Sequence, residues 1–124
     1  MTEDQWLPLS GSVVETIIQL HVRKEPGATV VSVEGEVDLL TAPRLAAVLT
    51  EQADGPAGLL VADLSTVDFF GAAGLEALAQ AQRRAVRAGV SFRLVAGPQV
   101  RRLLSLLQSE QPLHVYESLA EAIG

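Results

Sequence analysis

Apolar and polar positions alternate along residues 16–23 of the chain, which is the period-two pattern of a strand with one buried face. Pro26 and Gly27 follow and fit the two central positions of a type II turn. Apolar residues then alternate with polar ones again around Val31 and Val33. Residues 16–35 are therefore predicted to form an antiparallel hairpin.

The hydrophobic period becomes helical after Thr41. Thr41 is a suitable N-cap residue, and Pro43 falls in the first turn, where its missing N–H leaves no helical hydrogen bond unmade. Apolar residues at helical spacing follow until residues 53–58, ADGPAG, end the helix. A second helix is predicted from about Ala72, with Gly89 as its C′ residue. Arginines in its last turns complement the helix dipole.

Short apolar segments supply the other elements. Residues 59–64, LLVADL, form a continuous apolar run, as expected of a strand that is buried on both faces. Residues 90–96 predict a second central strand, residues 98–107 a third helix, and residues 113–116 a short strand. A capping box that begins at Ser118 predicts a last helix. The order ββαβαβα(β)α indicates an α/β domain with a mixed sheet of four to five strands, flanked by about four helices.

The chain shows neither an internal repeat nor a linker, so one domain is expected over residues 15–124. Residues 1–14 are weakly patterned and are assigned to an N-terminal arm, which is either free or forms a short edge strand. Trp6 and Leu7 in this arm are available to dock on the body of the domain.

Composition excludes several classes of function. The formal net charge is −6, whereas a nucleic-acid surface needs clustered lysine and arginine. The chain has no cysteine, and hence neither a disulfide nor a thiolate nucleophile. The acidic N-terminus lacks the apolar segment of a secretory signal, and no apolar run approaches the ~20 residues of a membrane helix. A cytoplasmic protein without membrane insertion is expected.

Residues 69–78, FFGAAGLEAL, predict a sharp turn from a buried strand into a helix. Helix N-termini at such turns stabilise negative charge, yet this turn carries neither a hydroxyl nor an acid. GAAG lacks the lysine and the glycine spacing of a phosphate-binding loop. Nothing in the sequence places His21 or His114 beside a nucleophile or a second metal ligand. We therefore expect no enzymatic activity, no cofactor and no metal.

Two acidic residues flank this turn in the predicted topology. Asp38 precedes the first helix, and Asp63 ends the predicted strand that leads toward residue 69. Carboxyl ends of strands are where ligands and partners bind in sheets of this type, so both acids are predicted to lie on one edge with GAAG. The alternative is that they cap helices or solvate loops.

Four segments in a preserved order resemble the STAS domain, and more narrowly the bacterial anti-sigma factor antagonists. They are GEVDLLTAPRL (35–45), VADLSTVDFFGAAGLEAL (61–78), RAGVSFRLV (87–95) and VRRLLSLL (100–107). The resemblance covers residues 15–123 and implies the family's mixed sheet flanked by helices.

The resemblance also implies a partner and a switch. In that family the antagonist binds an anti-sigma factor that is a serine kinase of the ATPase fold, and phosphorylation of a D-S-S-G-L motif at the helix start ends the interaction. Aligned on Gly74 and Leu75, the family's aspartate falls on Gly71, its first serine on Ala72 and its phosphoacceptor on Ala73. Ala73 accepts no phosphate, so the covalent switch is predicted to be lost.

The prediction is thus a protein-interaction module that binds an anti-sigma factor and so controls sigma-factor-dependent transcription. Its predicted partner-binding residues are Asp38, Thr41, Asp63, Gly71, Ala72, Ala73, Gly74, Leu75 and Glu76. The alternatives are a STAS accessory subunit of a lipid-transport ATPase, a stress-signalling scaffold, and a small-ligand sensor that uses the acidic edge. Self-association is left open.

Overall fold

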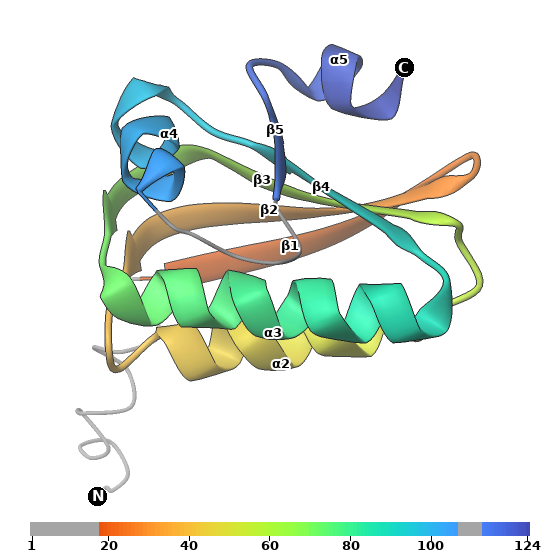
Figure 1. Cartoon of the computed structure of the whole chain (residues 1–124), viewed down its shortest axis with the longest axis horizontal. Helices are drawn as coiled ribbons and strands as arrows, with labels where there is room; N and C mark the ends of the chain where they lie inside the picture. The colour runs from red at the N-terminus through yellow and green to blue at the C-terminus, as the bar shows by residue number, and fades with distance from the viewer. Residues whose placement is uncertain (1–17, 107–112) are drawn as a thin grey trace, which may run out of the picture.

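The computed structural model describes residues 18–106 and 113–124, so the predicted N-terminal arm lies outside the described residues. The described residues form five strands and four helices (Figure 1). They are β1 (Ile18–Glu25), β2 (Ala28–Val37), α2 (Ala42–Ala53), β3 (Leu59–Phe70), α3 (Ala72–Ala88), β4 (Ser91–Val95), α4 (Pro98–Ser105), β5 (His114–Tyr116) and α5 (Leu119–Ile123). The predicted α/β order is confirmed.

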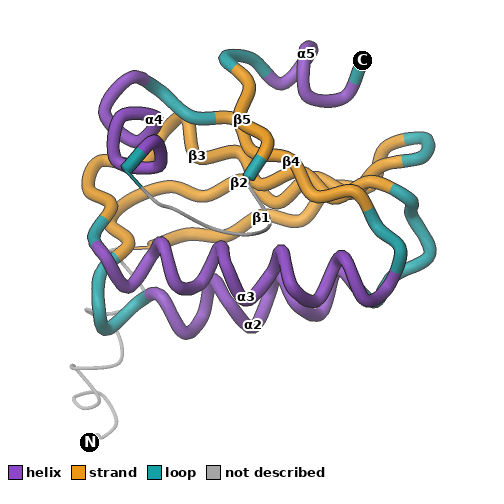
Figure 2. The backbone as a smooth tube through the Cα atoms, in the orientation of Figure 1, coloured by secondary structure: helices purple, strands orange, loops and turns teal. Residues whose placement is uncertain are grey.

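The strands form one mixed sheet in the order β1-β2-β3-β4-β5. β1 pairs antiparallel with β2, as the alternating pattern predicted, and the other three pairings are parallel. Figure 2 shows the sheet lying above α2 and α3, with α5 on the other side. The buried Val100 and Leu104 of α4 belong to the same core as α2 and α3. The long helices α2 and α3 run side by side along one face (Figure 1).

Side-chain alternation along the central strand explains this layering. Leu60, Ala62 and Leu64 belong to the large buried core that α2 and α3 cover. Val61, which points to the opposite face, packs in a smaller cluster with Ala122 of α5. Because successive residues of a strand face opposite sides, an apolar run such as LLVADL requires helices on both faces.

The prediction that the central strand ends at residue 64 is wrong. β3 continues to Phe70 and stays paired with β2, with register shifts of the kind that a β-bulge makes. Asp63 lies inside this strand, where its Oδ1 accepts hydrogen bonds from the backbone N and the Oγ of Ser65 at 3.0 and 2.7 Å. Bulges interrupt the period-two pattern, so this half of the strand looks like a turn in the sequence.

The end of α3 was predicted correctly. Gly89 is its C-cap, with φ 73°, and its N–H bonds back to the last turn. A left-handed residue at this point favours glycine because other residues meet steric strain there. Within the described residues no helix is long and apolar enough to cross a lipid bilayer.

Candidate functional site

The carboxyl ends of β2 and β3 bring two turns together at one edge of the sheet. Val37 pairs with Phe70, and the N–H of Gly71 donates to the carbonyl oxygen of Val37 at 2.9 Å. The loop from β2 to α2 therefore lies beside the junction of β3 and α3, at the left of Figure 1. We call residues 38–41 and 69–76 together the helix mouth.

Asp38 organises the first of these turns. Its Oδ1 accepts hydrogen bonds from the backbone N–H groups of Leu40 and Thr41 at 2.9 and 3.0 Å. Aspartate commonly folds a turn in this way, by bonding the backbone two residues on. Of the two roles that the sequence left open for Asp38, the structure shows the local, loop-closing one.

Thr41 occupies the predicted N-cap position, but its side chain acts differently. No capping hydrogen bond from its side chain forms. Its hydroxyl donates to the carbonyl oxygen of Glu36 at 2.8 Å and accepts from the N–H of Asp38 at 2.9 Å. Thr41 is 0% exposed, which corrects its assignment to the partner-facing surface: it shapes the loop from beneath.

Replacing Asp38 with alanine is expected to destabilise the fold by about 1–2 kcal/mol, because the exposed N–H of Leu40 and the partly buried N–H of Thr41 both lose their acceptor. Urea unfolding measures this loss. Asp38→Asn keeps the side-chain oxygen and is the control, so it should retain most of the stability. Equal losses for both variants would show that the charge, and not the hydrogen bonding, is what matters.

The start of α3 is built from small residues. Gly71 is its N-cap, with φ −97° and no side-chain capping bond. Ala72 is exposed and Ala73 is half-buried, and the first turn contains no acidic residue. The first N–H groups of a helix have no partner within it, so this end of α3 offers donors and a positive dipole end, with no acidic side chain in its own first turn and no capping side chain at Gly71.

Gly74 has a packing role. It is buried, and a Cβ atom on it would lie 2.6 Å from Cζ of Phe70. The ring of Phe70 is itself 8% exposed and belongs to the main core. Gly74 therefore lets the end of β3 pack directly under the first turn of α3. Its predicted role as a partner contact is corrected to this packing role.

Three large apolar side chains stand exposed around this turn. Leu39 is 80%, Leu40 68% and Phe69 53% exposed. Contiguous exposed apolar surface marks interaction sites in soluble proteins. None of these three residues is among the partner-binding residues predicted from the sequence, although two adjacent leucines in a turn before a helix N-terminus are a recognisable signal. Phe69 was not predicted to be exposed, because the pair of phenylalanines at 69 and 70 looked like the buried end of a strand.

The remaining predicted residues lie in three different places: one packs partly against the core, one is exposed, and one lies away from the helix mouth. Leu75 packs partly against the core, whereas Glu76 is exposed and pairs with Arg83 at 3.1 Å. Asp63 is paired with Ser32 of β2. It lies seven residues before Phe70, the last residue of β3. The prediction that Asp63 shares the edge of GAAG is therefore wrong, because β3 runs on well beyond it.

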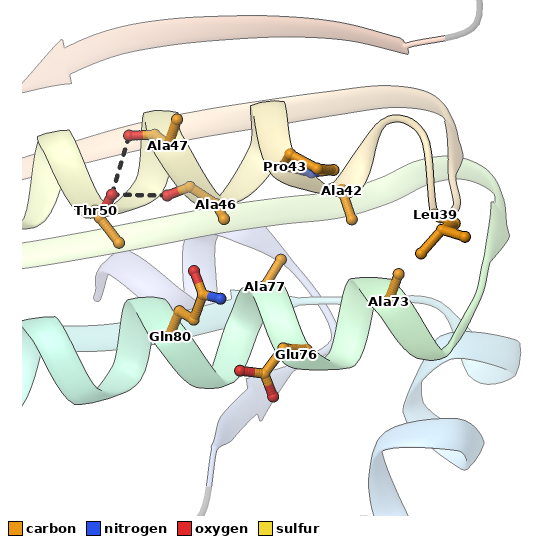
Figure 3. Close-up of a pocket in the computed structure, with 10 residues that line it drawn as sticks. All are labelled: Leu39, Ala42, Pro43, Ala46, Ala47, Thr50, Ala73, Glu76, Ala77 and Gln80. Carbon is orange, nitrogen blue, oxygen red and sulfur yellow. Dashed lines mark hydrogen bonds between the residues drawn. The ribbon is translucent and has the colours of Figure 1, made fainter.

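A groove leads away from the helix mouth between α2 and α3. It has a volume of about 560 Å³. Figure 3 shows Ala46 of α2 pointing toward α3, and Ala73 and Ala77 of α3 pointing toward α2. Its lining residues are Leu39, Ala42, Pro43, Ala46, Ala47, Thr50, Ala73, Glu76, Ala77 and Gln80. Most of them are apolar and small.

The chemistry of this surface suits binding. In the part of the chain that the structure describes, no group of three or more histidine, aspartate or glutamate side chains is placed to hold a metal ion. The helix mouth offers backbone donors and exposed apolar side chains, with Asp38 engaged in its own loop. Shape and apolar contact are the means of recognition that such a surface provides.

Comparison with known proteins agrees with this picture. The chain is 34% identical over 108 residues to anti-sigma-F factor antagonist RsfB of Mycobacterium tuberculosis, and the match covers 86% of this chain and 87% of RsfB. It also resembles the crystal structure of an anti-sigma factor antagonist from Mycobacterium paratuberculosis, at 34% identity and a TM-score of 0.77, over 86% of this chain and 91% of that one.

More distant structures share the fold. The anti-sigma factor antagonist SpoIIAA in its unphosphorylated form superposes with a TM-score of 0.61 at 14% identity, over 84% of this chain and 91% of SpoIIAA. The family described as the STAS domain matches residues 19–122, which include every element from β2 to β5 and all of α5 except its last residue. The chain therefore belongs to the STAS domain family.

Proposed function

We propose that this protein is an anti-sigma factor antagonist, which binds an anti-sigma factor and thereby releases a sigma factor for transcription. The observation that carries the proposal is the apolar surface at the helix mouth, where Leu39, Leu40 and Phe69 stand exposed. The similarity of the chain to RsfB over most of both sequences supports the same function. We infer a binding protein without enzymatic activity that works in the cytoplasm.

The partner that fits best is an anti-sigma factor of the serine-kinase ATPase fold. A kinase of this kind needs an acceptor hydroxyl at the helix mouth, and residues 71–73 are Gly, Ala and Ala. Thr41 is the nearby hydroxyl, and it is buried. The protein is therefore inferred to stay in the binding-competent state that phosphorylation would otherwise end, since a phosphate adds about −1.5 to −2 charges to a docking surface.

Isothermal titration of the purified protein with serine-kinase anti-sigma factors of its source organism tests this proposal. One of them should bind, and the complex should exclude or release the cognate sigma factor. Recovery from native cells of transporter permease and ATPase subunits, with no anti-sigma factor bound, would instead establish the accessory-subunit function.

Restoring the lost motif should restore the switch. The triple variant Gly71→Asp, Ala72→Ser, Ala73→Ser is expected to be phosphorylated at residue 73 by the cognate kinase and then to lose its affinity for it. The backbone permits the change, because Gly71 has φ −97°. A Cβ atom there lies 3.2 Å from the exposed ring of Phe69, which has room to move.

Mass spectrometry after incubation with kinase and ATP provides the readout. Ala73→Ser alone is the control that leaves Gly71 untouched, and the wild type should acquire no phosphate on residues 59–83, Ser65 and Thr66 included. A folded triple variant that binds the anti-sigma factor without being phosphorylated would show that this partner is not a serine kinase.

A further inference from the structure

We propose that the groove between α2 and α3 is a docking site for the N-terminal segment of the same chain. Residues 6–9, Trp-Leu-Pro-Leu, would fill the apolar groove, and Glu3 and Asp4 would reach the arginines farther along α3. The docking itself is independent of the proposed function. Its consequence for partner binding, set out below, rests on that function.

The groove suits an apolar peptide. Its alanine-lined walls keep the two helices' side chains short where they face one another (Figure 3). Its volume of about 560 Å³ lies in the range of sites that enclose small organic ligands. Burial of apolar surface contributes roughly 25 cal/mol of favourable free energy per Å². A tryptophan and two leucines would therefore be stabilised by docking in such a groove.

The chain enters the domain at the right place. Ile18 pairs with Gly35 near the carboxyl end of β2, and so lies at the same edge of the sheet as the helix mouth. Residues 10–17 can span at most about 27 Å when extended. The groove between Ala73 and Gln80 is about 10 Å long at 1.5 Å per helical residue. The segment is therefore long enough to round the start of α2 and lie along the groove.

The distribution of charged residues along α3 favours one orientation of the N-terminal segment in the groove. Beyond Gln80 the groove continues into a second depression, lined by Arg83, Arg84 and Arg87 together with Glu51 and Asp54. Arg84 pairs with Asp54 at 2.7 Å, which lowers the pKa of that carboxyl through the hydrogen bond. Arg83 pairs with Glu76.

Among residues 18–106 and 113–124, none forms an ion pair with Arg87. A chain that runs backwards from Ile18 along the groove would bring residues 6–9 into the apolar part first. It would then bring Glu3 and Asp4 to the basic end, where they would meet this unpaired guanidinium. The sequence order of apolar and acidic residues thus matches the order of surfaces along α3.

Docking would regulate the helix mouth. Leu39 and Ala73 belong both to the mouth and to the lining of the groove, so an occupied groove would cover part of the partner-binding surface. Under competition of this kind the apparent affinity is proportional to the undocked fraction, so it falls about tenfold when nine molecules in ten are docked. It would supply a control that does not need a phosphoacceptor.

Trp6 gives a direct test, because it is the chain's only tryptophan. In the full-length protein its fluorescence should be blue-shifted and protected from acrylamide, relative to a peptide of residues 1–17. Ala46→Glu, which places a carboxylate in the groove, and Leu7→Glu, which alters only the segment, should each abolish that protection. Ala120→Glu on α5 and Ser10→Glu are the matched controls and should preserve it.

Protection that survives both Ala46→Glu and Leu7→Glu in folded protein would overturn the proposal, as would a wild-type spectrum equal to that of the peptide. Protection that disappears on dilution would assign the segment to the groove of a second copy, which also overturns it. Deletion of residues 1–12 should raise the affinity for the anti-sigma factor. If no anti-sigma factor binds either form, the proposed function fails while the fluorescence result stands.

Discussion

Replacing Ala73 with glutamate is expected to weaken the binding of the anti-sigma factor about a hundredfold or more. Ala73 is half-buried in the first turn of α3, beside the exposed apolar side chains of the helix mouth. A carboxylate buried there by a partner would lose its water without gaining a counter-charge, and an uncompensated charge at an interface costs about 3 kcal/mol or more. That energy is about a hundredfold in affinity.

The same change should leave the free protein folded. A carboxylate in the first turn of a helix interacts favourably with the macrodipole, so Ala73→Glu is expected to match or exceed the wild type in thermal stability. Titration calorimetry against the anti-sigma factor measures the loss, with Ala120→Glu on α5 as the control of equal charge. Wild-type affinity in the folded Ala73→Glu variant would place the docking surface elsewhere on the domain.

Gly74→Ala is expected to destabilise the fold by about 1–3 kcal/mol, although alanine is the better helix former. The new Cβ atom would lie 2.6 Å from Cζ of Phe70, and two further ring atoms lie within 2.9 Å. The ring is held in the core at 8% exposure, so β3 or α3 must shift. Overpacking of this kind costs more than the roughly 1 kcal/mol that alanine gains in a helix.

Urea unfolding of four variants checks this prediction: Gly74→Ala, Gly58→Ala, Phe70→Leu and the double variant Phe70→Leu, Gly74→Ala. Gly58→Ala is the matched control, because a Cβ atom there meets nothing within 4 Å. Phe70→Leu combined with Gly74→Ala should lose less stability than the two single changes summed, since the smaller side chain relieves the contact. Strict additivity of the two losses would mean that Gly74 is required for a reason other than the ring.

The sequence alone determined the order of the elements and the mixed sheet flanked by helices. The evidence for them was local: period-two alternation, apolar runs, and end signals such as Gly89. These signals act through neighbouring residues, and a chain read in order displays them. The resemblance of the FFGAAGLEAL segment to the family motif was likewise carried by contiguous residues, and the family assignment is confirmed.

Only the tertiary structure decided which residues make up the helix mouth. Asp63 looked like the end of a strand, but pairing with β2 carries β3 seven residues further. Leu39, Leu40 and Phe69 are apolar residue types that are usually found in the core. They are exposed because they lie where the carboxyl ends of β2 and β3 leave the sheet.

Thr41 and Gly74 illustrate the same point from the inside. Both stand in the correct stretch of sequence, yet one is buried beneath the loop and the other is packed against a phenylalanine ring. Residue type and local period report a side chain's preference for water or for the core. Which residue of a turn meets solvent depends on strand register and on contacts between distant segments, and these exist only once the chain has folded.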